Sequence, residues 1–344
     1  MNQIQVIGSH NSYKEAIEPT LMKMLLARDS ARFSSLDYRH IPLARQLDAG
    51  LRKLEIDVVF DPKGGRYANP LGLQLVKQQG ATPAPFDPQG VMKEPGFKVL
   101  HVQDIDFRSH CLRLRDCLQD IKVWSDAHPR HLPIAISFNA KTDVINQPGF
   151  VQPLPFTAAA FDSLDAELLA VFPKARVITP DQVKGNYATL EAAVKAHQWP
   201  TIEQARGKVL FVLDESGEKL ATYVQGHSSL QGRVMFVNAR PGQPEAAFVI
   251  LNDPVLYHDS IQKLVRSGYL VRTRADEGTH EARKGDYRRL EAALSSGAQF
   301  ISTDYYLPDQ RFRTNYQVRL PDKPVARCNP ITRSAPCNNA TLEQ

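Results

Sequence analysis

The chain has 344 residues, of which 42% are hydrophobic and 23% are charged, and this ordinary globular composition excludes a disordered chain and allows a large core. Its 42 Lys and Arg residues against 37 Asp and Glu residues give a net charge of +5. This excess is too small and too scattered to indicate nucleic acid as a partner. It suits either simple solubility or an approach to anionic lipid or phosphate esters. No apolar run approaches the ~20 residues that span a bilayer.

Short apolar segments rich in β-branched residues recur along the chain and predict strands. They lie at 4–7, 54–59, 99–102, 134–138, 176–178, 209–213, 234–237, 248–251, 269–271 and 300–302. Helical patterns lie between them at 109–127, 156–172, 254–267 and 286–296. This alternation predicts a parallel sheet, and a number of strands near eight predicts a single-domain (β/α)₈ TIM-type barrel, either regular or distorted. Since ten strands are predicted, we expect one or two to lie outside the barrel.

Two regions break the alternation. Residues 61–97 are rich in Gly and Pro and show little periodicity, which predicts a long loop excursion between the second and third strands. Loops of that length are uncommon unless they are functional, and this excursion is our candidate for membrane contact. The segment after Leu307 is rich in Pro and Arg. We therefore expect a catalytic barrel over 1–307 and a C-terminal extension over 308–344, without a second domain.

The four cysteines fall into two close pairs, Cys111 with Cys117 and Cys328 with Cys337. Neither pair has the CxxC spacing of a zinc site, and no histidine cluster lies beside them. Two local disulfides fit better, and they would pin the C-terminal extension and indicate an oxidising compartment. Four cysteines allow three connectivities, of which pairing between neighbours is favoured, and four reduced thiols in a cytosolic protein are the alternative.

The chain runs from Met1 almost directly into the apolar segment 4–8, so no leader is visible. Together with the cysteines, this predicts a secreted or periplasmic protein whose signal peptide has been removed.

Polar residues gather where the first four predicted strands end, which is where barrels carry their chemistry. The first strand is followed by His10 and Asn11, the third ends at His101, and the fourth ends at Asn139 and Lys141. A single histidine near a strand end is more often structural than catalytic. Two of them beside amide and carboxylate side chains indicate a site.

Glu55 and Asp57 lie two residues apart in an apolar strand, so both carboxylates point to the same side of the sheet. Carboxylates are rarely buried unless they are paired or bind a metal. One interpretation is a metal site. The alternative is a pair of internal salt bridges, for example with Arg52 or Lys53.

Carboxylate and amide oxygens without thiolates suit a hard cation, and we expect calcium, with magnesium as the less favoured ion. The predicted ligands are Asn11, Glu55, Asp57 and Asn139. Hard cations do not favour imidazole, so His10 and His101 remain available for proton transfer.

Four segments resemble, in order, the motifs of the phosphatidylinositol-specific phospholipase C family. They are 8–13 (GSHNSY, similar to the SHNSY or THNTY signature), 52–57 (RKLEID, similar to R-x-x-E-x-D), 99–101 (the second histidine) and 133–138 (a further metal ligand). The segment 269–306 resembles the calcium-dependent bacterial and fungal branch of this family.

This resemblance implies a calcium-dependent phosphodiesterase that cleaves phosphatidylinositol to diacylglycerol and an inositol cyclic phosphate by attack of the inositol 2-hydroxyl. His10, His101 and Glu55 would be catalytic, Glu55 or Asp57 taking the hydroxyl proton and His101 protonating the leaving oxygen. The family usually has a glutamate at the position of Asn139, so this site lacks one negative charge. The enzyme would contact a membrane surface transiently, and no protein partner is indicated.

Three cations near predicted strand ends, Lys141, Arg272 and Arg274, are candidates for phosphate binding. The alternative for each is a solvated surface cation.

The sequence also allows two other functions. A glycerophosphodiester phosphodiesterase is also a metal-dependent barrel with acidic residues and two histidines, but its opening motif is His-Arg-Gly, whereas His10 precedes Asn11. A barrel that binds inositol lipids or glycans without turnover is favoured by Asn139. It is disfavoured by the intact set of His10, His101, Glu55 and Asp57.

Overall fold

The computed structural model describes residues 1–332 and 337–343. Within them, eight parallel strands form the wall of a nearly closed barrel in the order β6-β5-β4-β2-β1-β9-β8-β7. They are β1 (Ile4–Ser9), β2 (Lys53–Val59), β4 (Ile134–Ala140), β5 (Val209–Leu213), β6 (Met235–Val237), β7 (Phe248–Ile250), β8 (Leu270–Arg274) and β9 (Phe300–Thr303). A single parallel bridge between Asn238 and Phe248 joins the two ends of this sheet. The predicted barrel class is confirmed.

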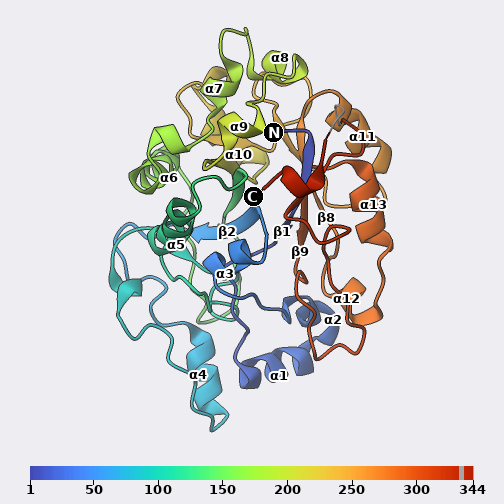
Figure 1. The fold of residues 1–344 in the computed structure, drawn as a ribbon. Coiled ribbons are helices and arrows are strands. Elements are labelled where there is room, and N and C mark those ends of the chain that lie inside the picture. Colours follow the sequence, from blue (N-terminus) through green and yellow to red (C-terminus); the bar gives the residue numbers. More distant parts are fainter. Residues whose placement is uncertain (333–336, 344) are drawn as a thin grey trace.

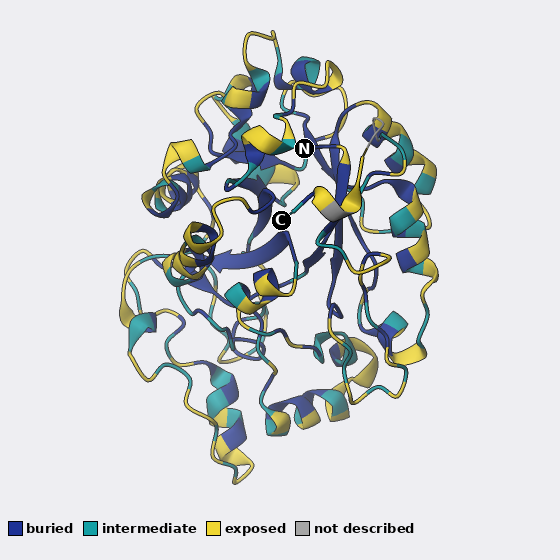
Figure 2. Cartoon of the chain, viewed as in Figure 1, coloured by how far each residue is buried: buried dark blue, intermediate teal, exposed yellow. Residues whose placement is uncertain are grey.

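Helices surround this barrel and expose their outer faces, whereas the strands are buried (Figures 1 and 2). They are α1 (Pro19–Arg28), α2 (Ser30–Phe33), α3 (Leu43–Asp48), α4 (Leu71–Gln78), α5 (Leu114–Ala127), α6 (Ala158–Val171), α7 (Pro180–Lys184), α8 (Leu190–Lys195), α9 (Ile202–Ala205), α10 (Gly217–Val224), α11 (His258–Arg266), α12 (His280–Lys284) and α13 (Arg288–Ser296). The 3₁₀ turns are η1 (Ser34–Leu36), η2 (Val91–Lys93), η3 (Lys174–Arg176), η4 (Ser228–Leu230) and η5 (Asn339–Thr341). The four predicted helical patterns correspond to α5, α6, α11 and α13.

The predicted strand at 99–102 is not a barrel strand. β3 (Lys98–Val99) has two residues and runs antiparallel to the last residues of β2. The next residues leave the sheet because the backbone N–H groups of His101 and Val102 donate to the carbonyl oxygen of Asp106 in a tight turn. His101 still lies at the mouth, the end of the barrel where the parallel strands finish, because β3 pairs with the finishing end of β2.

The predicted strand at 176–178 is also absent, because η3 ends at Arg176 and Val177 forms only an isolated bridge with Val209 of β5. Two of the ten predicted strands therefore lie outside the barrel, as expected. The strand β10 (Ala326–Cys328), which pairs antiparallel with β1, was not predicted. Its three residues include Arg327 and Cys328 and carry no apolar pattern.

The interior of the barrel near its mouth is polar. All positions of β2 are buried, and Lys53, Glu55 and Asp57 alternate with Leu54 and Ile56 along the strand. Since alternate residues of a strand point to opposite faces, the charged residues share one side. Leu54 and Ile56 share the other side and belong to the main hydrophobic core. The sequence pattern of β2 thus places its carboxylates inside the barrel.

A second hydrophobic core lies over one side of the mouth and joins segments that follow β1, β2 and β3. In Figure 1, α1, α2, α4 and α12 lie together at the lower end of the molecule, away from the N-terminus. The buried members of this core are Ile17, Leu21, Met22, Leu25, Phe33, Val59, Tyr67, Val76, Met92, Leu100, Ile105 and Phe107. The excursion 61–97 contributes to it and contains α4, which the sequence did not predict.

Helix α4 begins through a tertiary contact. The backbone N–H of Leu71 donates to the Asp104 carboxylate at 2.8 Å, and that of Gly72 donates to the Asp104 carbonyl oxygen, also at 2.8 Å. These bonds satisfy donors that have no partner within a helix. The local sequence, in which Leu71, Leu73 and Leu75 alternate with other residues, does not indicate a helix.

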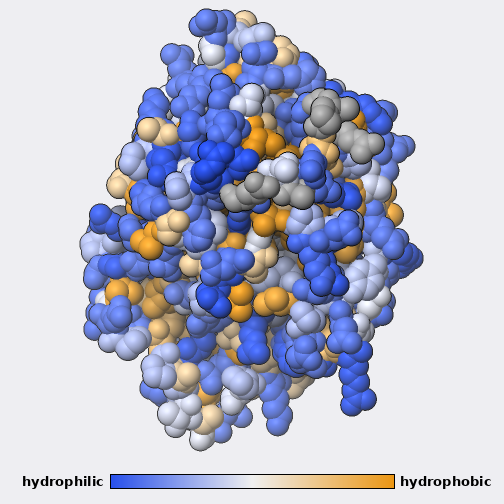
Figure 3. Space-filling model, viewed as in Figure 1, coloured by the Kyte–Doolittle hydropathy of each residue, from blue (hydrophilic) through white to orange (hydrophobic). Residues whose placement is uncertain are grey.

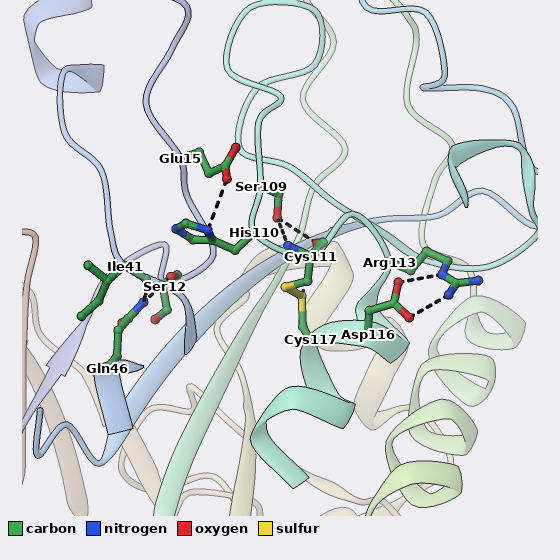
Figure 4. Close-up of a disulfide and its surroundings, with 10 residues drawn as sticks. All are labelled: Ser12, Glu15, Ile41, Gln46, Ser109, His110, Cys111, Arg113, Asp116 and Cys117. Carbon is green, nitrogen blue, oxygen red and sulfur yellow. Dashed lines mark hydrogen bonds and ion pairs between the residues drawn. A yellow bond between two sulfur atoms is a disulfide. The ribbon is translucent and has the colours of Figure 1, made fainter. Parts of the chain in front are cut away.

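Both predicted disulfides, Cys111–Cys117 and Cys328–Cys337, are present and confirm pairing between neighbours. The first links the loop before α5 to the first turns of that helix (Figure 4). In the C-terminal segment, Arg52 donates to the Glu343 carboxylate at 2.8 Å. Residues 333–336 and 344 of the predicted extension lie outside the described residues.

Among the described residues, no helix has the length and apolar character needed to cross a bilayer. The face of the molecule seen in Figure 3 is mainly hydrophilic and carries small, separate apolar patches.

Candidate active site

His10 follows β1, and a buried carboxylate and a guanidinium fix its ring. Its Nδ1 lies 2.9 Å from Oδ1 of Asp304, the residue after β9, and its Nε2 lies 3.5 Å from a guanidinium nitrogen of Arg274 on β8. Both contacts fit the neutral tautomer, in which Nδ1–H donates to Asp304 and Nε2 accepts. Burial, followed by the charge of Arg274, lowers the pKa of His10, which favours this neutral form.

Asp304 is held in its charged form. Burial alone would raise its pKa, but His10 and Arg274 outweigh burial and lower the pKa to about 2. Arg274 donates to the second carboxylate oxygen at 3.0 Å. A permanent carboxylate therefore orients the His10 ring.

His101, in the turn that follows β3, has a similar arrangement. Its Nδ1 lies 2.7 Å from Oδ2 of Asp106, and Oδ1 of Asp106 lies 2.9 Å from Nζ of Lys14. Burial would raise the pKa of Asp106, but Lys14 and His101 outweigh it and lower the pKa. Each histidine thus has its Nδ1 on a buried carboxylate, which leaves Nε2 for substrate.

Glu55 lies on β2, which pairs with both β1 and β3, the strands that precede His10 and His101. Its two carboxylate oxygens have different surroundings. Oε2 accepts from Lys53 at 2.5 Å and from Arg272 at 2.7 Å. Oε1 has only longer contacts, 3.4 Å to Nδ2 of Asn139 and 3.6 Å to Nε2 of His10. Burial would raise the pKa of Glu55, but Arg272 and Lys53 outweigh it and hold the pKa well below its usual value.

The salt-bridge alternative for Glu55 is therefore present in part. Lys53 pairs with Glu55, as that alternative suggested, whereas Arg52 pairs with Glu343. Burial lowers the pKa of Lys53 to about 8.

Asp57 and Asn139 complete the central part of the site. Asn139 donates from Nδ2 to Oδ1 of Asp57 at 3.1 Å, and Nζ of Lys141 lies 3.7 Å from Oδ2. Asn139 thus touches both carboxylates of β2. Asn11 donates from Nδ2 to the Tyr38 hydroxyl at 2.7 Å, which leaves its carbonyl oxygen for another partner.

No cluster of three or more His, Cys, Asp and Glu side chains suited to a metal occurs among residues 1–332 and 337–343. The predicted set contains only two carboxylates, and its remaining members are amides. The set nevertheless fits a hard cation. Asn139 lies 3.4 Å from Oε1 of Glu55 and 3.1 Å from Oδ1 of Asp57, so oxygens of both buried carboxylates gather around one amide group. Turning the Asn139 amide would present its oxygen in place of its nitrogen.

The predicted phosphate-binding cations are not all at the surface. Arg272 and Arg274 are 2% and 7% exposed, so the alternative of a solvated cation is wrong for both. Arg272 also donates to Oδ1 of Asn252, in the loop after β7, at 2.6 Å. Lys141 is half-buried beside Asp57 and is the more accessible of the three.

Four charged residues of the site were not among the predicted catalytic, metal-binding or phosphate-binding residues. Lys53 had a signal, since it precedes Glu55 by two positions on the same side of β2. Asp106 had a weaker one, since it follows His101 by five positions. Asp304 and Asp214 had no such local signal, because they follow β9 and β5 and lie far in sequence from Glu55 and His101. Burial raises the pKa of Asp214 to about 6.

The comparisons with known proteins agree with this geometry. The family model described as phosphoinositide phospholipase C, Ca²⁺-dependent, matches residues 1–330. A solved calcium-dependent phosphoinositol-specific phospholipase C from Pseudomonas sp. is 17% identical, with a TM-score of 0.55 and coverage of 95% of this chain and 94% of that one. A Ca²⁺-dependent phosphatidylinositol-specific phospholipase C from Streptomyces antibioticus is 20% identical, with a TM-score of 0.51 and coverage of 89% and 94%. The search of curated proteins gave no match.

Proposed function

Since the chain belongs to the Ca²⁺-dependent phosphoinositide phospholipase C family and is a phosphodiester hydrolase, we propose that it cleaves phosphatidylinositol to diacylglycerol and inositol cyclic phosphate. The observation that carries the proposal is the pair of histidines, His10 and His101, whose Nδ1 atoms are held by the buried carboxylates of Asp304 and Asp106. The family favours this function over a glycerophosphodiester phosphodiesterase, and the intact pair opposes a barrel without turnover.

We assign proton removal from the inositol 2-hydroxyl to Nε2 of His10. Glu55 suits this role less well than the sequence suggested, because Arg272 and Lys53 hold its pKa well below its usual value and make it a weak base. The 2-oxygen attacks phosphorus, the bond from phosphorus to the glycerol oxygen breaks, and His101 supplies the proton to that oxygen. Asp106 would stabilise the protonated ring of His101 before this transfer.

Calcium would be held by Asn11, Glu55, Asp57 and Asn139, and when bound it would supply positive charge beside the inositol and phosphate oxygens. Lys141, which lies 3.7 Å from the Asp57 carboxylate, and Arg274, which lies 3.5 Å from Nε2 of His10, would bind phosphoryl oxygens. Arg272 positions Glu55, and Asp304 and Asp106 position the two histidines.

The test is product analysis. Phosphatidylinositol should give diacylglycerol and inositol cyclic phosphate, detected by ³¹P NMR, and glycerophosphoinositol should be a much poorer substrate. Hydrolysis of glycerophosphoinositol in preference to the lipid would instead identify a glycerophosphodiester phosphodiesterase. Inositol lipid binding without any product would identify a non-catalytic barrel.

We propose that the mouth contacts the membrane through exposed apolar side chains in loops that follow barrel strands. Val144 after β4, Val255 and Leu256 after β7, and Leu307 after β9 are 63%, 60%, 70% and 44% exposed. Loops after parallel strands lie at the mouth, and Asn252 of the β7 loop already contacts Arg272 of the site. The excursion 61–97 contains none of the large exposed apolar side chains of the described chain.

Replacing Val144 and Leu256 with glutamine should lower activity on phosphatidylinositol vesicles by ~10-fold or more, because each apolar side chain loses its burial in lipid. Activity on a short-chain monomeric substrate should not change. Val123→Gln is the matched control, since Val123 is 59% exposed but lies on α5. Equal losses in the control, or an equal loss on the monomeric substrate, would exclude this membrane contact.

We also propose secretion to an oxidising compartment, either outside the cell or in the periplasm, which the two disulfides support. The chain would form one catalytic barrel over 1–307 with an extension over 308–344, whose pairing of β10 with β1 supports a fixed position. Mass mapping of the natural protein under non-reducing conditions tests the compartment, and four free thiols would oppose it.

A further inference from the structure

A groove of about 640 Å³ opens beside the active site, over the second hydrophobic core. Its walls come from α1, α2, α4 and the loop 145–150. Its lining includes Leu25, Phe33, Leu75, Ile105 and Ile145, together with His101. The groove is thus mainly apolar, and the imidazole that we assigned to the leaving oxygen forms part of its lining.

We propose that this groove binds the acylated glycerol of the lipid substrate, namely the glycerol esters and the adjoining part of the acyl chains. The inference rests on the proposed function. Because His101 lines the groove, the glycerol oxygen that it protonates lies next to the groove. The rest of the leaving group then extends along an apolar surface.

The rim of the groove matches the polar part of a glycerol ester. Arg28 and Arg32 both line it and are exposed, and Arg28 donates to Oε1 of Gln147 across the groove at 3.1 Å. Ester carbonyls are acceptors only, so they suit guanidinium donors. The volume lies within the ordinary range for pockets that bind small ligands, so the groove holds part of the lipid and leaves the ends of its chains to the bilayer.

The groove also gives a role to the excursion 61–97. Leu71 and Leu75 of α4 form one wall, and Asp104, three residues after His101, fixes the first turn of α4. The excursion therefore builds a surface for the leaving group next to the histidine that acts on it.

The first experiment measures binding of the product alone. Calorimetry with monomeric dihexanoylglycerol should show binding to the native protein and ~10-fold weaker binding to Leu75→Gln, because that change removes apolar contact. Leu73→Gln is the matched control, since Leu73 is also half-buried on α4 but is not among the residues that line the groove. If Leu75→Gln does not fold, Ile145→Gln in the loop 145–150, which also lines the groove, carries the same expectation.

The second experiment measures turnover of monomeric phosphatidylinositols of increasing chain length. We expect kcat/KM to rise by about fourfold per methylene until the groove is filled, and this rise should flatten in Leu75→Gln but not in Leu73→Gln. Absence of dihexanoylglycerol binding by the native protein, or equal binding by both variants, would contradict the proposal that the groove binds the acylated glycerol. Binding with the expected difference but no turnover would support the groove and reject the proposed function.

Discussion

Replacing His101 with glutamine is expected to lower turnover of phosphatidylinositol by ~10²–10⁴-fold, the usual contribution of general acid catalysis. The loss should nearly disappear with an inositol phosphodiester whose leaving group is p-nitrophenol. That weakly basic leaving group departs without a proton, so an enzyme without its general acid can still expel it. The measurement is kcat on both substrates.

His10→Gln is the companion variant, because our assignment places His10 on the opposite side of phosphorus. Its loss should be of similar size on both substrates, since the 2-hydroxyl must lose its proton in either case. If the better leaving group rescues His10→Gln and not His101→Gln, the two histidines have the opposite roles to those assigned here. No loss in either variant would end the two-histidine mechanism.

The barrel was predictable because its signals are local. Apolar runs such as 134–138 and 248–251 are followed by helical patterns, at 156–172 and 254–267, and both features are set by residues close together in sequence. Two of the elements that were missed depend on distant contacts. α4 needs Asp104 at its first turn, and β10 needs the edge of β1.

The centre of the site was predictable for a different reason, because charged residues in an apolar strand stand out. Glu55 and Asp57 are conspicuous in β2, and Asn139 is paired directly with Asp57 in the register of β4. The surroundings that decide what Glu55 can do were less visible. Arg272 lies 217 positions away in sequence, and only the closure of the barrel brings it to the Glu55 carboxylate.

These surroundings also bear on calcium. Within the site, Lys53 and Arg272 balance Glu55, and Lys141 lies beside Asp57. A cation that enters this place meets two carboxylates whose charge is already partly offset. Because the number of anionic ligands tunes calcium affinity over orders of magnitude, we expect weak binding and activity only at calcium concentrations well above trace levels.

Chelation should therefore lower turnover of the native enzyme by ~10³-fold, since a bound metal contributes several kcal/mol to the transition state, and added calcium should restore it. Asn139→Glu should lower the calcium concentration for half-maximal activity by ~10-fold or more, because a third carboxylate joins the site. Asn139→Gln is the matched control, because glutamine has the length of glutamate without its charge, and it should not show this gain in calcium affinity. Calcium binding measured by calorimetry should follow the same order. Full activity of the native enzyme in excess chelator would exclude the metal, and an unchanged calcium midpoint in Asn139→Glu would remove Asn139 from the ligands.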